Sequence, residues 1–183
     1  MKRCANCSKE LRSPKKSNQT LCPKCSKHLS SHFKVSEPYD PPNQIEPNLW
    51  LGSYQSACNK SNLICLKIKN ILIVGNRMKQ KFPESFNYLQ IPIDDDEREN
   101  IFSLFPKLIK FIEASLAKNE GILVHCLGGV SRSATIVIAY MIKTKKWKMR
   151  RALKYVKEKR SCINPNKGFL DQLDDYADYI KKT

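Results

Sequence analysis

One short segment, VHCLGGVSRSAT at residues 124–135, combines a cysteine, two glycines and an arginine. The apolar residues before Cys126 predict a buried strand, and the apolar run after Arg132 predicts a buried helix. A glycine turn between a strand and a helix N-terminus binds anions, because its backbone N–H groups and the helix dipole attract negative charge. Arg132 adds a guanidinium whose planar fork binds phosphate through two hydrogen bonds. The segment therefore predicts a phosphate site.

The same surroundings would activate Cys126 as a nucleophile. A free thiol has a pKa near ~8.5, and helix N-termini or neighbouring cations lower such values to ~3.5–7.5. Gly128 and Gly129 would let the backbone come close to the bound anion. We therefore expect a thiolate that faces a phosphate, while the loop amides and Arg132 spread the charge of the transition state.

Other interpretations of this segment fit its residues less well. No lysine follows the glycines as a nucleotide-binding P-loop requires, and the G-x-G-x-x-G pattern of dinucleotide sites is absent. Cys126 has no C-x-x-C partner, which excludes a thioredoxin-type redox pair. A buried structural cysteine remains as the alternative, but the order strand, Cys, Gly-Gly, Arg, helix favours the phosphate site.

A second set of cysteines lies in residues 1–34, with the spacing C-x2-C-x14-C-x2-C. Each C-x2-C turn presents two sulfurs to one ion, so this spacing is typical of a tetrahedral zinc site. The region has few large apolar residues, and domains this small need a metal or disulfides for stability. We therefore expect a zinc-ribbon-like module with one structural zinc. Its predicted ligands are Cys4, Cys7, Cys22 and Cys25.

Length and composition limit the remaining possibilities. The 183 residues suffice for one sizeable domain and a small appendage. The longest apolar run, residues 134–142, is too short to cross a bilayer, and no apolar signal segment begins the chain. Eight cysteines without such a signal favour a reducing compartment, and hence an intracellular protein of the cytoplasm or nucleus.

The net charge of +16 is unevenly distributed. Residues 1–34 hold nine Lys/Arg against one acid, and residues 143–160 hold ten against one. Such basic segments favour an anionic partner, either an acidic protein or nucleic acid. The alternative is a solvated helix face that only aids solubility.

Strands and helices alternate after a proline-rich linker at residues 35–43. Residues 44–183 therefore predict an α/β catalytic domain whose central sheet is mostly parallel. Expected strands lie at 49–52, 71–74, 88–93 and 122–125, and expected helices at 56–68, 105–116, from about Ser131, from about Met149, and from about Phe169.

The motif HCLGGVSRS resembles the H-C-x5-R-[ST] signature of the cysteine-dependent protein phosphatases. Together with the apolar helix after it, the motif is similar to their dual-specificity branch. IEPNLWLG, the segment around YLQIPIDDD, and INPNKGFLDQLDDY also resemble that branch, so the resemblance covers residues 44–181. It implies the dual-specificity phosphatase fold, namely a central sheet flanked by helices.

The resemblance also implies a role for each residue of the motif. Cys126 would attack phosphorus and form a phosphocysteine, His125 would orient the loop, and Ser133 would help the thiolate leave. The implied phosphate-binding residues are Leu127, Gly128, Gly129, Val130, Ser131 and Arg132.

A general acid is expected in the loop after IPI. The family's I-x-x-x-D pattern places it at Asp95, with Asp94 and Asp96 as flanking alternatives. Chemistry also requires such an acid, because a phenolate or alkoxide is a poor leaving group, and proton donation contributes roughly 10²–10⁴-fold. The same residue would then serve as the base for water.

The expected activity is a dual-specificity protein phosphatase for phosphotyrosine and phosphoserine/phosphothreonine, with no cofactor in catalysis. A catalytic domain of this compact size implies a shallow pocket. Residues 127–131 contain no lysine, unlike phosphoinositide-directed relatives, and Ser131 stands where RNA-directed relatives have asparagine. The alternatives are an RNA 5′-phosphate or phosphoinositide phosphatase, and a zinc adaptor that binds phosphorylated partners with little activity.

Overall fold

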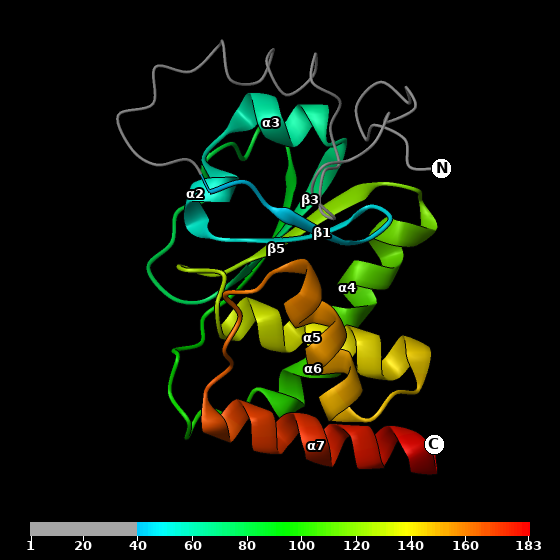
Figure 1. Cartoon of the computed structure of the whole chain (residues 1–183). Coiled ribbons are helices and arrows are strands. Elements are labelled where there is room, and N and C mark those ends of the chain that lie inside the picture. Colours follow the sequence, from blue (N-terminus) through cyan, green and yellow to red (C-terminus); the bar gives the residue numbers. More distant parts are fainter. Residues whose placement is uncertain (1–39) are drawn as a thin grey trace.

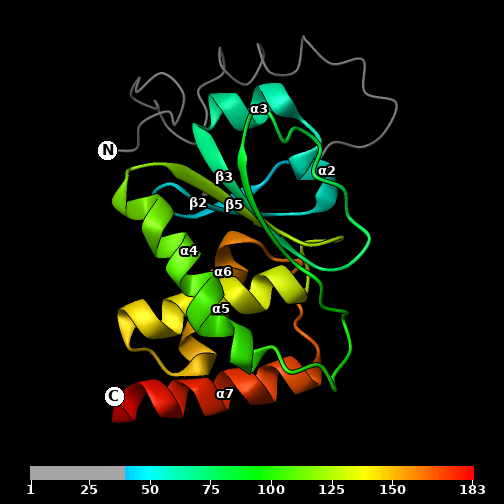
Figure 2. The same cartoon turned by 180° about the vertical axis from the view of Figure 1, so that it is seen from behind.

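A five-stranded sheet lies at the centre of residues 40–183, the part of the chain that the computed structural model describes (Figures 1 and 2). The strand order is β1-β2-β5-β3-β4. β1 runs antiparallel to β2, and all other neighbours are parallel, which confirms the predicted, mostly parallel sheet. The strands are β1 (Asn43–Glu46), β2 (Leu49–Gly52), β3 (Ile68–Val74), β4 (Asn87–Ile91) and β5 (Gly121–His125).

Helices cover both faces of this sheet (Figures 1 and 2). Side chains of a strand alternate between faces, so Ile122 and Val124 of β5 belong to one apolar core and Leu123 to the other. The first core is closed by α4 to α7 and the second by α2 and α3. The helices are α2 (Tyr54–Ala57), α3 (Lys60–Cys65), α4 (Phe105–Ala117), α5 (Arg132–Lys145), α6 (Met149–Lys159) and α7 (Lys167–Lys182), with a 3-10 turn, η1 (Phe102–Leu104), before α4.

The single helix expected at 56–68 is wrong, because this segment forms two short helices and the start of β3. The Asn59 side chain accepts a hydrogen bond from the Asn62 backbone N–H, which starts a new helix at Lys60. Lys67 has a positive φ of 57°, which ends the helical path before Ile68 enters the sheet.

The strand expected to continue to Ile93 ends at Ile91. Pro92 follows directly, and a proline has no N–H to donate to a neighbouring strand. The chain therefore leaves the sheet just before the acidic segment 94–97.

The prediction of a buried helix after the phosphate loop is confirmed. α5 begins at Arg132 with Ser131 as its N-cap residue, and nine of its side chains are buried. β5 is the central strand, so the loop between β5 and α5 emerges at the carboxyl ends of the parallel strands. Ligands in open α/β sheets bind at this edge.

None of the helices in residues 40–183 is long and apolar enough to cross a membrane. The predicted module at 1–34, with Cys4, Cys7, Cys22 and Cys25, lies outside the described residues. Of the predicted linker at 35–43, residues 40–43 are described, and Asn43 already belongs to β1.

Candidate active site

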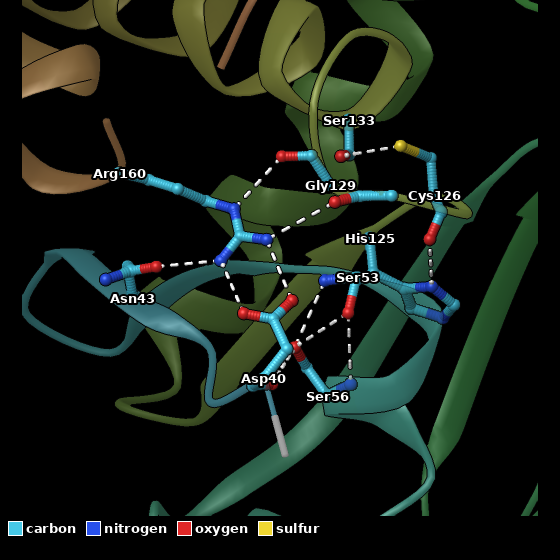
Figure 3. A network of polar contacts seen from close by, with 10 residues as sticks. Asp40, Asn43, Ser53, Ser56, His125, Cys126, Gly129, Ser133 and Arg160 are labelled. Carbon is cyan, nitrogen blue, oxygen red and sulfur yellow. Dashed lines mark hydrogen bonds and ion pairs between the residues drawn. The ribbon is translucent and has the colours of Figure 1, made fainter. Parts of the chain in front are cut away.

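Cys126 lies at the start of the loop, and only 2% of the residue is exposed. Ser133 in the first turn of α5 donates a hydrogen bond from Oγ to Cys126 Sγ, over 3.2 Å (Figure 3). The hydroxyl and the sulfur are thus held together by the β5–loop–α5 connection. A hydroxyl donor in this position stabilises negative charge on the sulfur.

The ring of His125 is buried beneath the loop. Burial lowers its pKa to about 4, although a hydrogen bond to the backbone of Cys126 acts in the opposite direction. The ring is therefore neutral near pH 7. Its Nδ1 lies 3.2 Å from the Cys126 carbonyl oxygen, so Nδ1 carries the proton and donates it to this acceptor (Figure 3). This contact orients the first peptide group of the loop.

The guanidinium of Arg132 lies beside the residues that follow the carboxyl ends of β3 and β4. Its Nη1 donates to the Ile93 carbonyl oxygen over 3.3 Å, whereas its buried Nε makes no hydrogen bond within residues 40–183. Gly75 provides the space, because a Cβ there would overlap the guanidinium. Arg132 therefore keeps donor capacity for an anion.

Asp95 accepts two hydrogen bonds, one from the phosphate loop and one from the residue that precedes α7. Its Oδ1 accepts from Ser131 Oγ over 2.6 Å and from Asn166 Nδ2 over 2.9 Å. Its Oδ2 lies 3.8 Å from Arg132 Nε. Asn166 also caps α7, because its Oδ1 accepts from the Phe169 N–H. The carboxylate is thus brought to the loop that carries Cys126.

The neighbouring acids make their side-chain contacts elsewhere. Asp94 accepts from Asn76 Nδ2 over 2.9 Å. Asp96 forms a 2.7 Å ion pair with Arg98, whose hydrogen bonds hold the pKa of Asp96 far below its usual range. Of the three consecutive aspartates, Asp95 is the one held against the loop.

Sequence reasoning did not identify Asn166 or Arg160. The segment INPNKGF resembles the dual-specificity branch, but no residue pattern in the sequence pairs Asn166 with Asp95. Arg160 is one of ten basic residues in 143–160, yet it is buried and donates to the backbone of the phosphate loop.

The described part of the chain does not contain a cluster of metal-ligating side chains. No group of three or more His, Cys, Asp or Glu side chains in residues 40–183 could hold a metal ion. The cysteines in this part are all free, and they are Cys58, Cys65, Cys126 and Cys162.

Comparisons with known proteins show a family similarity over most of the chain. Residues 49–179 match the family model "Dual specificity phosphatase, catalytic domain". Protein phosphatase Slingshot of Drosophila melanogaster is 39% identical over 138 residues, covering 75% of this chain and 13% of that protein. Human dual specificity protein phosphatase 9 is 42% identical over 137 residues, covering 74% of this chain and 36% of that protein.

A solved structure extends the similarity to three dimensions. The human tyrosine phosphatase-like serine/threonine/tyrosine-interacting protein has a TM-score of 0.72 and 40% identity, over 78% of this chain and 99% of that chain. By contrast, this chain spans less than two fifths of the length of the two curated relatives above.

Proposed function

Because the chain belongs to the dual specificity phosphatase family, we propose that it hydrolyses phosphate esters of tyrosine, serine and threonine in proteins. The observation that carries this proposal is that four side chains meet at one loop. Cys126 and Ser133 supply a thiol with a donor, and Asp95 lies against the same loop beside Arg132.

In the first step, the Cys126 thiolate attacks phosphorus. A sulfur–phosphorus bond forms, the bond between phosphorus and the substrate oxygen breaks, and that oxygen takes a proton from Asp95. Arg132 and the loop N–H groups bind the three remaining phosphoryl oxygens and stabilise their charge. Ser131 and Asn166 keep the Asp95 carboxyl group beside the loop.

In the second step, water attacks the phosphocysteine. Asp95, now deprotonated, takes a proton from the water, and the sulfur–phosphorus bond breaks. Ser133 donates a hydrogen bond to the departing thiolate, which the 3.2 Å contact with Cys126 supports. Inorganic phosphate leaves, and every group returns to its starting state without a cofactor.

The side chain that follows the nucleophile supports a protein substrate. Leu127 is 63% exposed although it is large and apolar, so it offers a surface to the ring of phosphotyrosine or to a neighbouring peptide side chain. The loop contains no lysine that would bind the additional phosphates of an inositol lipid.

RNA 5′-phosphate is the alternative substrate, and a basic helix would attract it. α6 exposes Arg150, Arg151, Lys154 and Lys157, and the whole chain carries a net charge of +16. This charge would attract any polyanion, including an acidic protein, so it does not by itself select RNA.

A comparison of kcat/KM among substrate classes tests the proposed function. The full-length chain is assayed with phosphotyrosine and phosphothreonine peptides, 5′-triphosphate RNA and phosphoinositide vesicles at one ionic strength. We expect the highest kcat/KM for the phosphopeptides. A higher value for RNA or lipid would reassign the substrate, and no turnover with any of them would favour a phospho-binding adaptor.

We also propose a structural zinc in residues 1–34, supported by the spacing of Cys4, Cys7, Cys22 and Cys25. Elemental analysis of the full-length chain should find about one zinc per molecule. The double variant Cys4→Ser/Cys22→Ser should lose it. The matched control is Cys58→Ser/Cys162→Ser, because both residues are exposed thiols outside that region. Equal zinc in both variants would contradict the assignment.

A further inference from the structure

Arg160, the residue that follows α6, joins the phosphate loop to the segment before β1 (Figure 3). The residue is only 5% exposed. Its Nε donates to the Gly129 carbonyl over 3.0 Å, and Nη2 donates to the Gly128 carbonyl over 3.3 Å. On its far side, the guanidinium binds both carboxylate oxygens of Asp40, at 2.9 and 3.3 Å, and Asn43 Oδ1 at 2.8 Å. No catalytic step described above uses this residue.

The contacts of Arg160 determine which way two backbone amides point. A trans peptide group is planar, so its C=O and the following N–H point in opposite directions. Holding the carbonyls of Gly128 and Gly129 toward Arg160 therefore turns the N–H groups of Gly129 and Val130 the other way. Those N–H groups then face the inner side of the loop, where a phosphoryl group would bind.

The neighbouring carbonyls of the loop are held from outside in the same manner. The Leu127 carbonyl accepts from the Tyr54 N–H over 3.0 Å, and the Val130 carbonyl accepts from the Asn164 N–H over 2.9 Å. These two donors belong to the main chain, whereas the donors in the middle of the loop belong to the Arg160 side chain. The centre of the loop thus depends on a residue that substitution can alter.

The centre is also where the backbone is freest to turn. Gly129 has a positive φ of 66°, and a Cβ there would lie 2.5 Å from the Gly52 carbonyl oxygen, so the position requires glycine. Glycine pairs rotate more readily than other residues. If the peptide group between Gly128 and Gly129 turned over, it would present a carbonyl oxygen to the phosphate instead of a donor. Arg160 opposes that rotation.

Asp40 provides the counter-charge that a buried guanidinium needs. Burial raises the pKa of Asp40, but hydrogen bonds from Arg160 and Ser53 outweigh it and lower the pKa overall, so the Asp40 carboxylate is ionised near pH 7. The Asp40 carbonyl also accepts from Ser56 Oγ over 2.7 Å, which ties the segment before β1 to the start of α2 (Figure 3).

We propose that Arg160, held by Asp40, is a positioning residue that keeps the Gly129 and Val130 N–H groups directed at the phosphoryl oxygens of the substrate. This inference rests on the proposed function. Lysine is the sharpest substitution, because it keeps the charge but, as a point charge without a planar fork, cannot serve two carbonyls and Asp40 together.

The full-length variants Arg160→Lys and Asp40→Asn are compared with wild type in two assays. In Arg160→Lys we expect kcat for a phosphotyrosine peptide to fall about 10–100-fold, part of the roughly 10²–10³-fold that loss of one oxyanion donor costs. Asp40→Asn keeps an acceptor for Arg160 and should lose less. Asp171→Asn is the matched control, because it breaks an exposed ion pair with Lys167 and should leave kcat unchanged.

The second assay does not require catalysis. Binding of inorganic tungstate is measured by calorimetry, and the backbone N–H resonances of Gly129 and Val130 are followed by NMR. We expect Arg160→Lys to bind tungstate more weakly and to show smaller shifts of these two resonances. If wild type turns over no phosphoester, the proposed function fails, but this assay still tests the positioning role.

Folding is monitored by urea unfolding of each variant, and rates are expressed per folded molecule. The proposal is overturned if Arg160→Lys equals wild type in kcat and tungstate affinity per folded molecule, and in the tungstate-induced shifts of the two resonances. In that case the residue is only structural.

Discussion

Replacing Cys126 with serine should abolish phosphate release, with kcat at least about 10⁴-fold below wild type. A serine hydroxyl stays protonated at neutral pH and is a far weaker nucleophile than a thiolate. The replacement is nearly the same size, and the buried hydroxyl keeps Ser133 as a hydrogen-bond partner. The loop should therefore retain its shape and still bind substrate.

Two measurements on the Cys126→Ser variant separate chemistry from binding. Initial rates with p-nitrophenyl phosphate and a phosphotyrosine peptide report the chemical step, and tungstate calorimetry reports the intact loop. Cys162→Ser is the matched control, because Cys162 is an exposed free thiol and should not affect either measurement. If Cys126→Ser turns over substrate at the wild-type rate, the nucleophile is another group. Retained binding would also make the variant a means of capturing the physiological substrate.

The site residues that the sequence alone could place together are those whose neighbours are local. Cys126, Arg132 and Ser133 stand within one strand–loop–helix segment, so the hydrophobic pattern of β5 and α5 also fixes where they meet. The membership in the dual specificity phosphatase family that the motif suggested is confirmed for residues 49–179.

The contacts that sequence reasoning did not find join distant parts of the chain. Asn166 and Asp95 are separated by 71 residues, and Arg160 and Asp40 by 120. Residues 143–160 are basic on most positions, and charge alone does not reveal that Arg160 turns inward at the end of α6. A buried arginine is recognised only from the carbonyls and the carboxylate that receive its five donors.

The choice among three consecutive aspartates shows the same limit. The resemblance to the family's I-x-x-x-D pattern implied Asp95 but left Asp94 and Asp96 as alternatives. What distinguishes them is their partners, because Asp94 bonds to Asn76 and Asp96 pairs with Arg98, away from the loop. Local sequence does not specify these partners, since a turn can direct adjacent side chains to different sides.

Replacing Asp95 with asparagine should slow the reaction according to the leaving group. An amide cannot donate the proton that an alkoxide or phenolate needs, so kcat should fall roughly 10²–10³-fold with phosphothreonine and phosphotyrosine peptides. The loss should be smaller with p-nitrophenyl phosphate, because nitrophenolate leaves readily without a proton. Asparagine keeps an oxygen that accepts from Ser131 and Asn166, so the loop should stay in place.

The controls for this prediction are the neighbouring acids. Asp94→Asn and Asp96→Asn alter contacts with Asn76 and Arg98 but leave the carboxylate beside the loop, so their kcat should stay near wild type. Initial rates with the three substrates test all variants together. A uniform loss in Asp95→Asn, independent of the leaving group, would indicate a role in holding the loop rather than in proton transfer. A larger loss in either neighbour would move the general acid to that position, and the contacts of Asp95 with Ser131 and Asn166 would then be structural.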